Sequence, residues 1–346
     1  MAAVLAGCGS AQTEKTSVFI AAEWNLQALF DGEENGNEYD EYRESALWTP
    51  EKYTARLNAI SLAILKMRPE ASPPDLMGFV EVENAGVLKD LAGALSKYGG
   101  YSTAFASLPG SPLGIGFISR FPITETRSHS ITVGEDTAPR PVLELRVEPD
   151  GKPLVFLLCH WKSKLGGDKA TETLRRASAG VVQRRLRELR ESEAETPVII
   201  MGDLNENHDE FFRQSYLCAL LPDDHDAAEL ARNAAGHSAD FLVLSKEKPP
   251  RSSCFPEDTP ALYSPWYNEL SEGSYFYKDQ WETIDHLLLS ESLFDGSGWE
   301  YSGCRVLNNA PFTAANGEPD RYVPRQGRGL SDHLPLLLEL KLAGAN

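Results

Sequence analysis

The segment Ser331-Asp332-His333-Leu334-Pro335 opens an apolar run that extends to Leu342, and it carries the most information about this 346-residue chain. The run reads as a β-strand. Asp332 can ligate a metal ion, and His333 can act as a general base or acid, best when a buried carboxylate orients it. Asp285, in Ile284-Asp285-His286 beside another apolar run, is the expected partner of His333.

Four further motifs place polar side chains directly after an apolar run. They are Trp24-Asn25, Glu81, His160-Trp161-Lys162-Ser163 and Gly202-Asp203-Leu204-Asn205. Strand ends of one sheet converge in space, so we expect these groups to share a pocket. Alternate strand residues face the same side, which predicts that Asp203 and Asn205 point into it together. Taken singly, each motif has an ordinary alternative as a turn or a solvated strand end.

The residue types suit a hard cation. Mg²⁺ prefers oxygen ligands and takes one or two carboxylates, with water and substrate completing its shell. Glu81 is the expected principal ligand, because an acid beside a buried strand is costly unless it is paired or metal-bound. His160 could donate to a phosphate oxygen. Lys162 is placed to attract an anionic substrate, or is simply a solvated charge.

The net charge argues against one way of binding nucleic acid. Lys and Arg number 33 against 51 Asp and Glu, a net charge of −18. Such a surface repels nucleic acid at long range, which argues against binding by bulk charge but not against a local basic rim. The stretch 160–190 is basic, but its apolar spacing predicts a helix whose stripe packs on a sheet. No apolar run is long enough to predict a membrane-spanning helix.

The N-terminus indicates export. Leu5-Ala6-Gly7-Cys8 resembles a lipoprotein processing site, although only seven residues precede Cys8. We expect residues 1–16 to be a signal remnant and tether, and residues 17–346 to form one domain. A lipid on Cys8 would hold the protein at a membrane, in the periplasm or at the cell surface, with no obligate protein partner. A frayed terminus of small residues is the alternative.

If the protein is exported, Cys254 and Cys304 could form a disulfide. The cysteine spacing matches no zinc motif.

The element pattern predicts the fold class. Helical spacing appears at 51–67, 85–95 and 171–190, and strand-like runs occur between and after them. Many strands adjoin in hairpin-like pairs without an intervening helix. This favours two packed sheets with helices outside, over a doubly wound parallel sheet, which needs a helix after nearly every strand. The segment 206–280 is rich in loop residues and gives no clear pattern.

Together, the motifs from Trp24-Asn25 to Ser331-Asp332-His333-Leu334-Pro335 resemble the endonuclease/exonuclease/phosphatase superfamily, to which pancreatic deoxyribonuclease belongs. The resemblance implies an α/β fold, a four-layered α-β-β-α sandwich of two packed mixed sheets flanked by helices. It also implies that Asn25, Glu81 and Asp332 bind Mg²⁺, with Mn²⁺ or Ca²⁺ as possible substitutes.

The same resemblance implies catalytic roles. His160 matches a phosphate-contacting histidine, and Asp203 with Asn205 matches the pair that orients water and phosphate. Asp285 matches the acid that pairs with the catalytic His333. Arg140 and Lys162 are expected to contact the substrate. The implied reaction is metal-dependent hydrolysis of phosphodiester bonds in DNA or RNA. The alternatives are a phospholipid or sugar-phosphate hydrolase on the same fold, and a non-catalytic surface binding protein.

Overall fold

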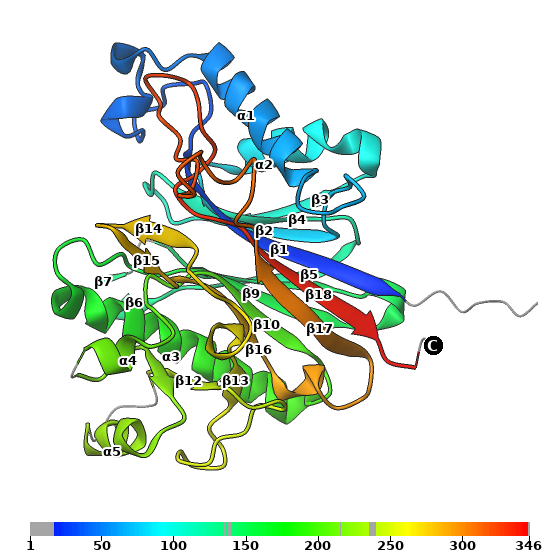
Figure 1. The fold of residues 1–346 in the computed structure, drawn as a ribbon, viewed down its shortest axis with the longest axis vertical. Coiled ribbons are helices and arrows are strands. Elements are labelled where there is room, and N and C mark those ends of the chain that lie inside the picture. Colours follow the sequence, from blue (N-terminus) through cyan, green and yellow to red (C-terminus); the bar gives the residue numbers. More distant parts are fainter. Residues whose placement is uncertain (1–16, 134–135, 138–139, 215, 235–239, 345–346) are drawn as a thin grey trace, which may run out of the picture.

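The computed structural model describes residues 17–133, 136–137, 140–214, 216–234 and 240–344. Within them, two mixed β-sheets pack face to face and helices cover their outer faces (Figure 1). This confirms the predicted α-β-β-α sandwich. The expected processing site at Cys8 lies outside the described residues.

The first sheet has six strands, and the second has eight. In spatial order, the first consists of β17 (Trp299–Val306), β18 (Leu336–Leu342), β1 (Val18–Leu29), β2 (Leu76–Val82), β4 (Gly114–Ser119) and β3 (Ser102–Ala106). The second consists of β11 (Leu220–Pro222), β12 (Leu242–Ser245), β13 (Ala261–Tyr263), β16 (Asp285–Leu289), β10 (Val198–Asp203), β9 (Leu154–His160), β8 (Val142–Val147) and β5 (Ile123–His129). Because β1 and β2 lie in the first sheet, and β9, β10 and β16 in the second, the predicted site motifs come from both sheets.

Helices and two small hairpins complete the molecule. The helices are α1 (Pro50–Ile64), α2 (Ala85–Ala94), α3 (Asp168–Glu193), α4 (Glu210–Arg213) and α5 (His225–Asn233). The hairpins pair β6 (Thr132–Val133) with β7 (Asp136–Thr137), and β14 (Tyr275–Tyr277) with β15 (Gln280–Glu282). None of the helices in the described ranges is long and apolar enough to cross a membrane.

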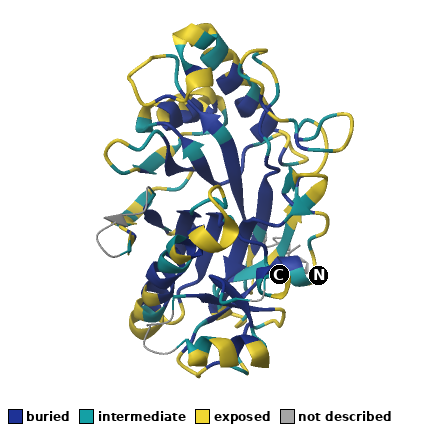
Figure 2. Ribbon diagram, turned by 90° about the vertical axis from the view of Figure 1, so that its left-hand side faces the viewer, coloured by how far each residue is buried: buried dark blue, intermediate teal, exposed yellow. Residues whose placement is uncertain are grey.

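Apolar side chains form three successive layers. α1 and α2 pack on the outer face of the first sheet. Facing side chains of the two sheets fill the space between them. α3 packs on the outer face of the second sheet. Figure 2 shows the result as buried strands through the centre and exposed residues on the outer surfaces of the helices. Each strand therefore has one face toward the central layer, and this alternation determines which polar residues reach the site.

The helix α1 illustrates how the sequence sets an element. Thr49 caps its N-terminus by accepting a hydrogen bond from the Lys52 amide, and Pro50 occupies the first turn. Leu57, Ile60 and Ile64 are buried against the first sheet, as their spacing predicts. The end falls earlier than the predicted residue 67, because the chain turns after Ile64.

The basic helix α3 lies on the outside of the second sheet, as its apolar stripe predicts. Three of its arginines are held by other groups: Arg175 by Glu172, Arg176 by Asp240 and Arg185 by Glu144. These three arginines therefore form ion pairs within the protein. Cys254 and Cys304 are free thiols in the structure, so the disulfide considered from the sequence is not formed.

Candidate active site

Three neighbouring strands of the second sheet deliver polar side chains to one edge of the central layer. Asp203 ends β10, and it pairs in register with His160 at the end of β9 and with Asp285 at the start of β16. In each strand the residues two positions away, such as Met201 and Leu158, belong to the core between the sheets. The three polar residues therefore continue the inward-facing rows beyond the apolar core, as strand alternation predicts.

Gly202 makes this close approach possible. Its φ is +124°, and a Cβ at this position would lie 2.0 Å from the carbonyl oxygen of Cys159 on β9. Only glycine tolerates this conformation and this contact without displacement of the backbone. The close pairing of β9 with β10 therefore requires glycine at position 202.

The first sheet contributes Asn25, which continues the inward-facing row of β1, and Glu81, which a bulge positions. The pairing of β2 shifts register between Val80 and Val82, and Glu81, at the shift, has a positive φ of 61°. Val80 faces the central layer, so regular alternation would aim Glu81 away from the site. The bulge reverses this and re-aims the side chain. A second register shift follows Asn25 on β1, where Gln27 and Ala28 also have positive φ.

The two sheets meet through these side chains. The Asn25 amide donates to Oδ2 of Asp203 across 3.0 Å. Nε2 of His160 lies 3.7 Å from both Oε1 of Glu81 and Oδ2 of Asp203. Groups that are 178 residues apart in the chain, such as Asn25 and Asp203, are thus in direct contact.

His333 and Asp285 form a buried pair. Nδ1 of His333 lies 2.8 Å from Oδ2 of Asp285, and Nε2 lies 3.9 Å from Oδ1 of Asp332. Asp332 and His333 are in the loop that leads into β18, which begins only at Leu336 and not at Ser331. The loop is fixed by Ser331, whose hydroxyl donates to the carbonyl of Asn25, and by Trp24, whose indole donates to the carbonyl of His333.

Charge and burial shift the pKa values here in opposite directions. Burial lowers the pKa of His333, but the ion pair with Asp285 outweighs it and leaves the pKa well above its usual value. Burial, with Arg140 and His333 nearby, holds the pKa of His160 well below its usual range, so this ring is neutral. Burial and Asp285 raise the pKa of Asp203 to about 7. Burial also raises the pKa of Glu81, and Asp332 adds to the effect while Arg140 opposes it.

Arg140 and Lys162 are the two cations predicted to contact the substrate. The positive charge of Arg140 contributes to the pKa shifts of Glu81, His160 and Lys162, in each case after the effect of burial. Nε of Arg140 is buried and has no hydrogen-bond partner among the described residues. Lys162 contacts the hydroxyl and carbonyl of Ser163 at 3.3 Å. Both cations are therefore free of carboxylate partners in the described contacts.

Asn205 reaches the site differently from the prediction. β10 ends at Asp203, so strand alternation does not extend to Asn205, which has a φ of 52°. The backbone N–H of Asn205 donates to Oδ1 of Asp203, and the side-chain amide donates to the carbonyl of Trp161. A left-handed turn, which asparagine tolerates well, brings it beside β9.

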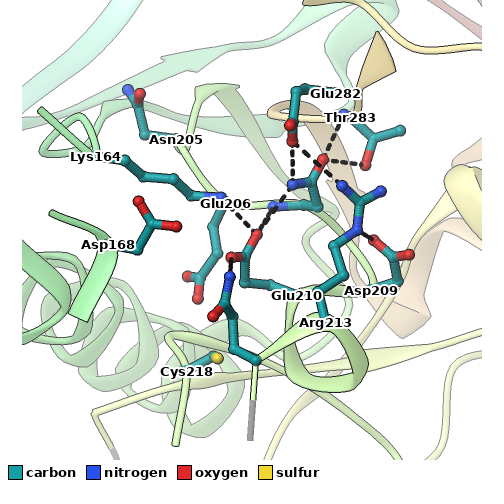
Figure 3. A network of polar contacts seen from close by, with 12 residues as sticks. Lys164, Asp168, Asn205, Glu206, Asp209, Glu210, Arg213, Cys218, Glu282 and Thr283 are labelled. Carbon is teal, nitrogen blue, oxygen red and sulfur yellow. Dashed lines mark hydrogen bonds and ion pairs between the residues drawn. The ribbon is translucent and has the colours of Figure 1, made fainter. Parts of the chain in front are cut away.

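The loop after Asn205 is held by the polar network of Figure 3. Asn207 accepts from the backbone amide of Thr283 at 2.7 Å and donates to Glu210 at 3.0 Å. Lys164 pairs with Glu210 at 2.7 Å, while Arg213 joins Asp209 and Glu282. The network ties the loop after β10 to the segment that leads into Asp285.

Three residues at the site were not predicted from the sequence. Glu23, on the inward face of β1, is fully buried with neither carboxylate oxygen hydrogen-bonded in the described part of the chain. Burial, then Asp285 and Asp203, raises its pKa well above the usual range. The hydroxyl of Ser274 donates to Oδ2 of Asp285 at 2.6 Å. The ring of Tyr275 stacks on the His333 imidazole with centroids 4.5 Å apart. The inward alternation of β1 marks Glu23, but the sequence carries no signal for the other two.

Comparison with known proteins agrees with this geometry. Residues 20–234 match the model of the Endonuclease/Exonuclease/phosphatase family. No curated protein matches the chain by sequence.

Solved structures with low identity share the fold. An endonuclease/exonuclease/phosphatase family protein from Bacteroides thetaiotaomicron is 18% identical, with 96% of this chain and 98% of that chain covered and a TM-score of 0.55. A mannosyl-6-phosphatase from the same organism is 17% identical, with 93% and 99% covered and a TM-score of 0.51. ANGEL2, described as a 2',3'-cyclic phosphatase, is 14% identical, with 94% and 96% covered and a TM-score of 0.56.

The family match begins in β1 and includes Glu81, His160, Asp203 and Asn205, and it covers more than half of the chain. The protein therefore belongs to the Endonuclease/Exonuclease/phosphatase family of phosphoester hydrolases.

Proposed function

We propose that this protein is a metal-dependent nuclease that hydrolyses phosphodiester bonds in DNA or RNA. The observation that carries the proposal is the meeting of Asn25 and Glu81 from one sheet with His160 and Asp203 from the other, beside the His333–Asp285 pair. This cluster offers oxygen ligands for a cation and a histidine that an acid orients, the two requirements for activating water on a phosphate ester.

The acid content of the site fits a divalent cation. Asp203, Asp285 and His333 present ligand atoms within 4.8 Å of one another. Burial raises the pKa of Glu23, Glu81 and Asp203, as expected of carboxylates crowded together without enough positive charge. Hard oxygen donors of this kind favour Mg²⁺, and Mn²⁺ or Ca²⁺ could substitute.

Two sets of residues could hold the ion. The most compact set is Asp203, Asp285 and His333. In the compact set, Nδ1 of His333 and Oδ2 of Asp285 are already hydrogen-bonded to each other. We therefore favour Asn25, Glu81 and Asp332 as the ligands. When bound, the ion would neutralise phosphate charge and stabilise the leaving oxygen.

The remaining residues have distinct tasks. Asp285 fixes Nδ1 of His333, which leaves Nε2 free to exchange a proton on the pocket side. Asp203 and Asn205 orient the attacking water and the phosphate. His160, neutral because of its burial, donates to a non-bridging oxygen, and Arg140 and Lys162 attract the anion.

We also propose that the protein acts outside the cytoplasm, anchored through a lipid at Cys8. The support is the Leu5-Ala6-Gly7-Cys8 motif in the sequence. A surface with a net charge of −18 then requires that substrate attraction be local, from the cations beside the pocket.

A substrate panel tests the proposed function. The purified protein is assayed on plasmid DNA, single-stranded DNA and RNA, sphingomyelin and mannose 6-phosphate, each in Mg²⁺ and in EDTA. We expect hydrolysis of the nucleic acids in Mg²⁺ and none in EDTA. Preferential hydrolysis of sphingomyelin or the sugar phosphate would replace the nuclease assignment, and inactivity on the whole panel would support a binding protein.

A further inference from the structure

A ladder of aromatic rings runs outward from the catalytic histidine. The Tyr275 ring lies on the His333 imidazole, 27° from parallel. The Tyr277 ring follows at 6.1 Å from Tyr275 and 17° from parallel. Half of the Tyr277 side chain remains exposed, at 51%. The Nζ atom of Lys278, in the turn that follows, lies 5.1 Å from the centroid of the Tyr277 ring. The ladder therefore begins in the buried site and ends on a half-exposed ring whose neighbour is a flexible cation.

The hairpin that bears these rings is fixed at its base. The amide of Leu334 donates to the carbonyl of Ser274 at 2.7 Å, and Tyr275 forms a β-bridge with His333. Phe276, on the opposite face of β14, packs against Trp281 on β15. Lys278 and Asp279 both have positive φ, the geometry of a two-residue turn whose twist matches the strands. Tyr275 and Tyr277, two positions apart on β14, thus share one face of a short, anchored hairpin. Figure 1 shows this β14–β15 hairpin.

Tyr275 also belongs to the electrostatic environment of the site. Burial and then Asp332 raise its pKa to about 12, so its hydroxyl is neutral and can donate a hydrogen bond. The proposed hydrolysis gives no task to Tyr277, which lies farther from His333 than Tyr275 does. A half-exposed aromatic ring that continues a stack from the site toward the surface offers a surface for another flat ring.

We propose that Tyr277 is a stacking platform for an unpaired nucleobase next to the scissile phosphate, which makes single-stranded nucleic acid the preferred substrate. This inference rests on the proposed nuclease function and specifies its substrate. Bases are available for stacking only where a strand is unpaired, and base–aromatic stacking is tolerant of sequence. The acidic segment 31–44, on the Glu81 side of the site, adds repulsion against the second backbone of a duplex.

Binding measurements test the platform without requiring turnover. A fluorescent single-stranded oligonucleotide of about eight nucleotides is titrated with protein in EDTA, and anisotropy gives Kd. A matched oligonucleotide with abasic sugars throughout has the same charge and no bases. Tyr277→Ala should raise Kd about tenfold for the base-bearing strand, Tyr277→Phe should retain the affinity, and neither should change Kd for the abasic strand.

A control variant and a duplex complete the design. Leu62→Ala, on exposed α1, should leave every Kd unchanged. In Mg²⁺, Tyr277→Ala should lower kcat/KM about tenfold on the single strand and less on the duplex. Equal losses on the base-bearing and abasic strands would mean that Tyr277 contacts the backbone, and an unchanged Kd would mean that it contacts nothing; either result overturns the proposal. Absence of cleavage with base-selective binding would instead overturn only the nuclease assignment.

Discussion

The pKa values of the two buried histidines of this site are shifted in opposite directions. The carboxylate of Asp285 outweighs burial at His333 and raises its pKa well above the usual value, whereas burial, with Arg140 adding to it, lowers the pKa of His160 well below that value. The difference is consistent with the tasks that we propose for them: proton exchange for His333, and hydrogen-bond donation to a charged oxygen for His160. Glu23, buried beneath the pair without a partner in the described residues, adds a neutral carboxyl to the floor of the site.

Replacing His333, the proposed proton-exchanging group, should abolish most of the turnover. We expect His333→Ala to lower kcat by at least ~10²-fold, because general acid–base catalysis contributes this much, with little change in thermal stability. His225→Ala, at the exposed start of α5, serves as the matched control and should retain full activity. A His333→Ala enzyme with wild-type kcat would remove His333 from the mechanism.

Replacing the proposed principal ligand should change metal affinity. Glu81→Gln keeps the size of the side chain and removes its charge, so the Mg²⁺ concentration for half-maximal activity should rise by about tenfold or more. Glu41→Gln, on the exposed neighbouring loop, controls for loss of general negative charge. Superimposable Mg²⁺ titrations of Glu81→Gln and the wild type would show that Glu81 is not a ligand.

Strand alternation explains how much of the site the sequence could predict. Asn25, Asp203 and Asp285 were predicted because each continues an inward-facing apolar row. Glu81 was predicted from its position beside an apolar run, but its direction depends on a bulge that no residue type announces. The left-handed turn at Asn205 and the strands β11–β13 were equally invisible, since short runs between loops lack a clear period. Tyr275 reaches the site only through its contact with His333, 58 positions away along the chain, which no local pattern indicates.

The attachment of α3 to β8 has a pH dependence that follows from one ion cluster. Burial raises the pKa of Glu144, but hydrogen bonds from His129 and Arg185 outweigh it and hold the pKa at about 2, against 4.5 normally. A lowered folded-state pKa contributes stability above the unfolded value, and the contribution is lost as pH falls through the folded value. It is therefore complete above pH 4.5 and disappears toward pH 2.

Glu144→Gln should expose this contribution. We expect a loss of roughly 2 kcal/mol in the free energy of unfolding at neutral pH, shrinking as pH falls below about 4.5. Urea unfolding at a series of pH values measures it. Glu125→Gln, in an exposed pair with Arg127, should cost less than about 1 kcal/mol throughout. A Glu144→Gln loss that is constant from pH 7 to pH 3 would contradict the assigned cause.

At the scale of the whole molecule, two sheets meet at one site. Asn25 and Glu81 come from the first sheet, and His160, Asp203 and Asp285 come from the second, so the site exists only when the central apolar layer is formed. A cation bound across this junction should also stabilise the fold, by about 2.7 kcal/mol at a concentration 100 times its Kd. Thermal unfolding in Mg²⁺ and in EDTA measures this, and Glu81→Gln should reduce the difference. Equal Tm values with and without Mg²⁺ in the wild type would argue against a resident ion.

Asp203 lies where the sheets meet, in contact with Asn25 of one and in register with His160 and Asp285 of the other. The decisive measurement is therefore the Mg²⁺-dependent cleavage of a single-stranded oligonucleotide by the wild type and by Asp203→Asn. We predict wild-type activity that EDTA removes and Mg²⁺ restores, and kcat at least ~10²-fold lower in Asp203→Asn at saturating Mg²⁺. Cleavage that persists in EDTA, or an Asp203→Asn enzyme as fast as the wild type, would contradict a metal-dependent site assembled at this junction.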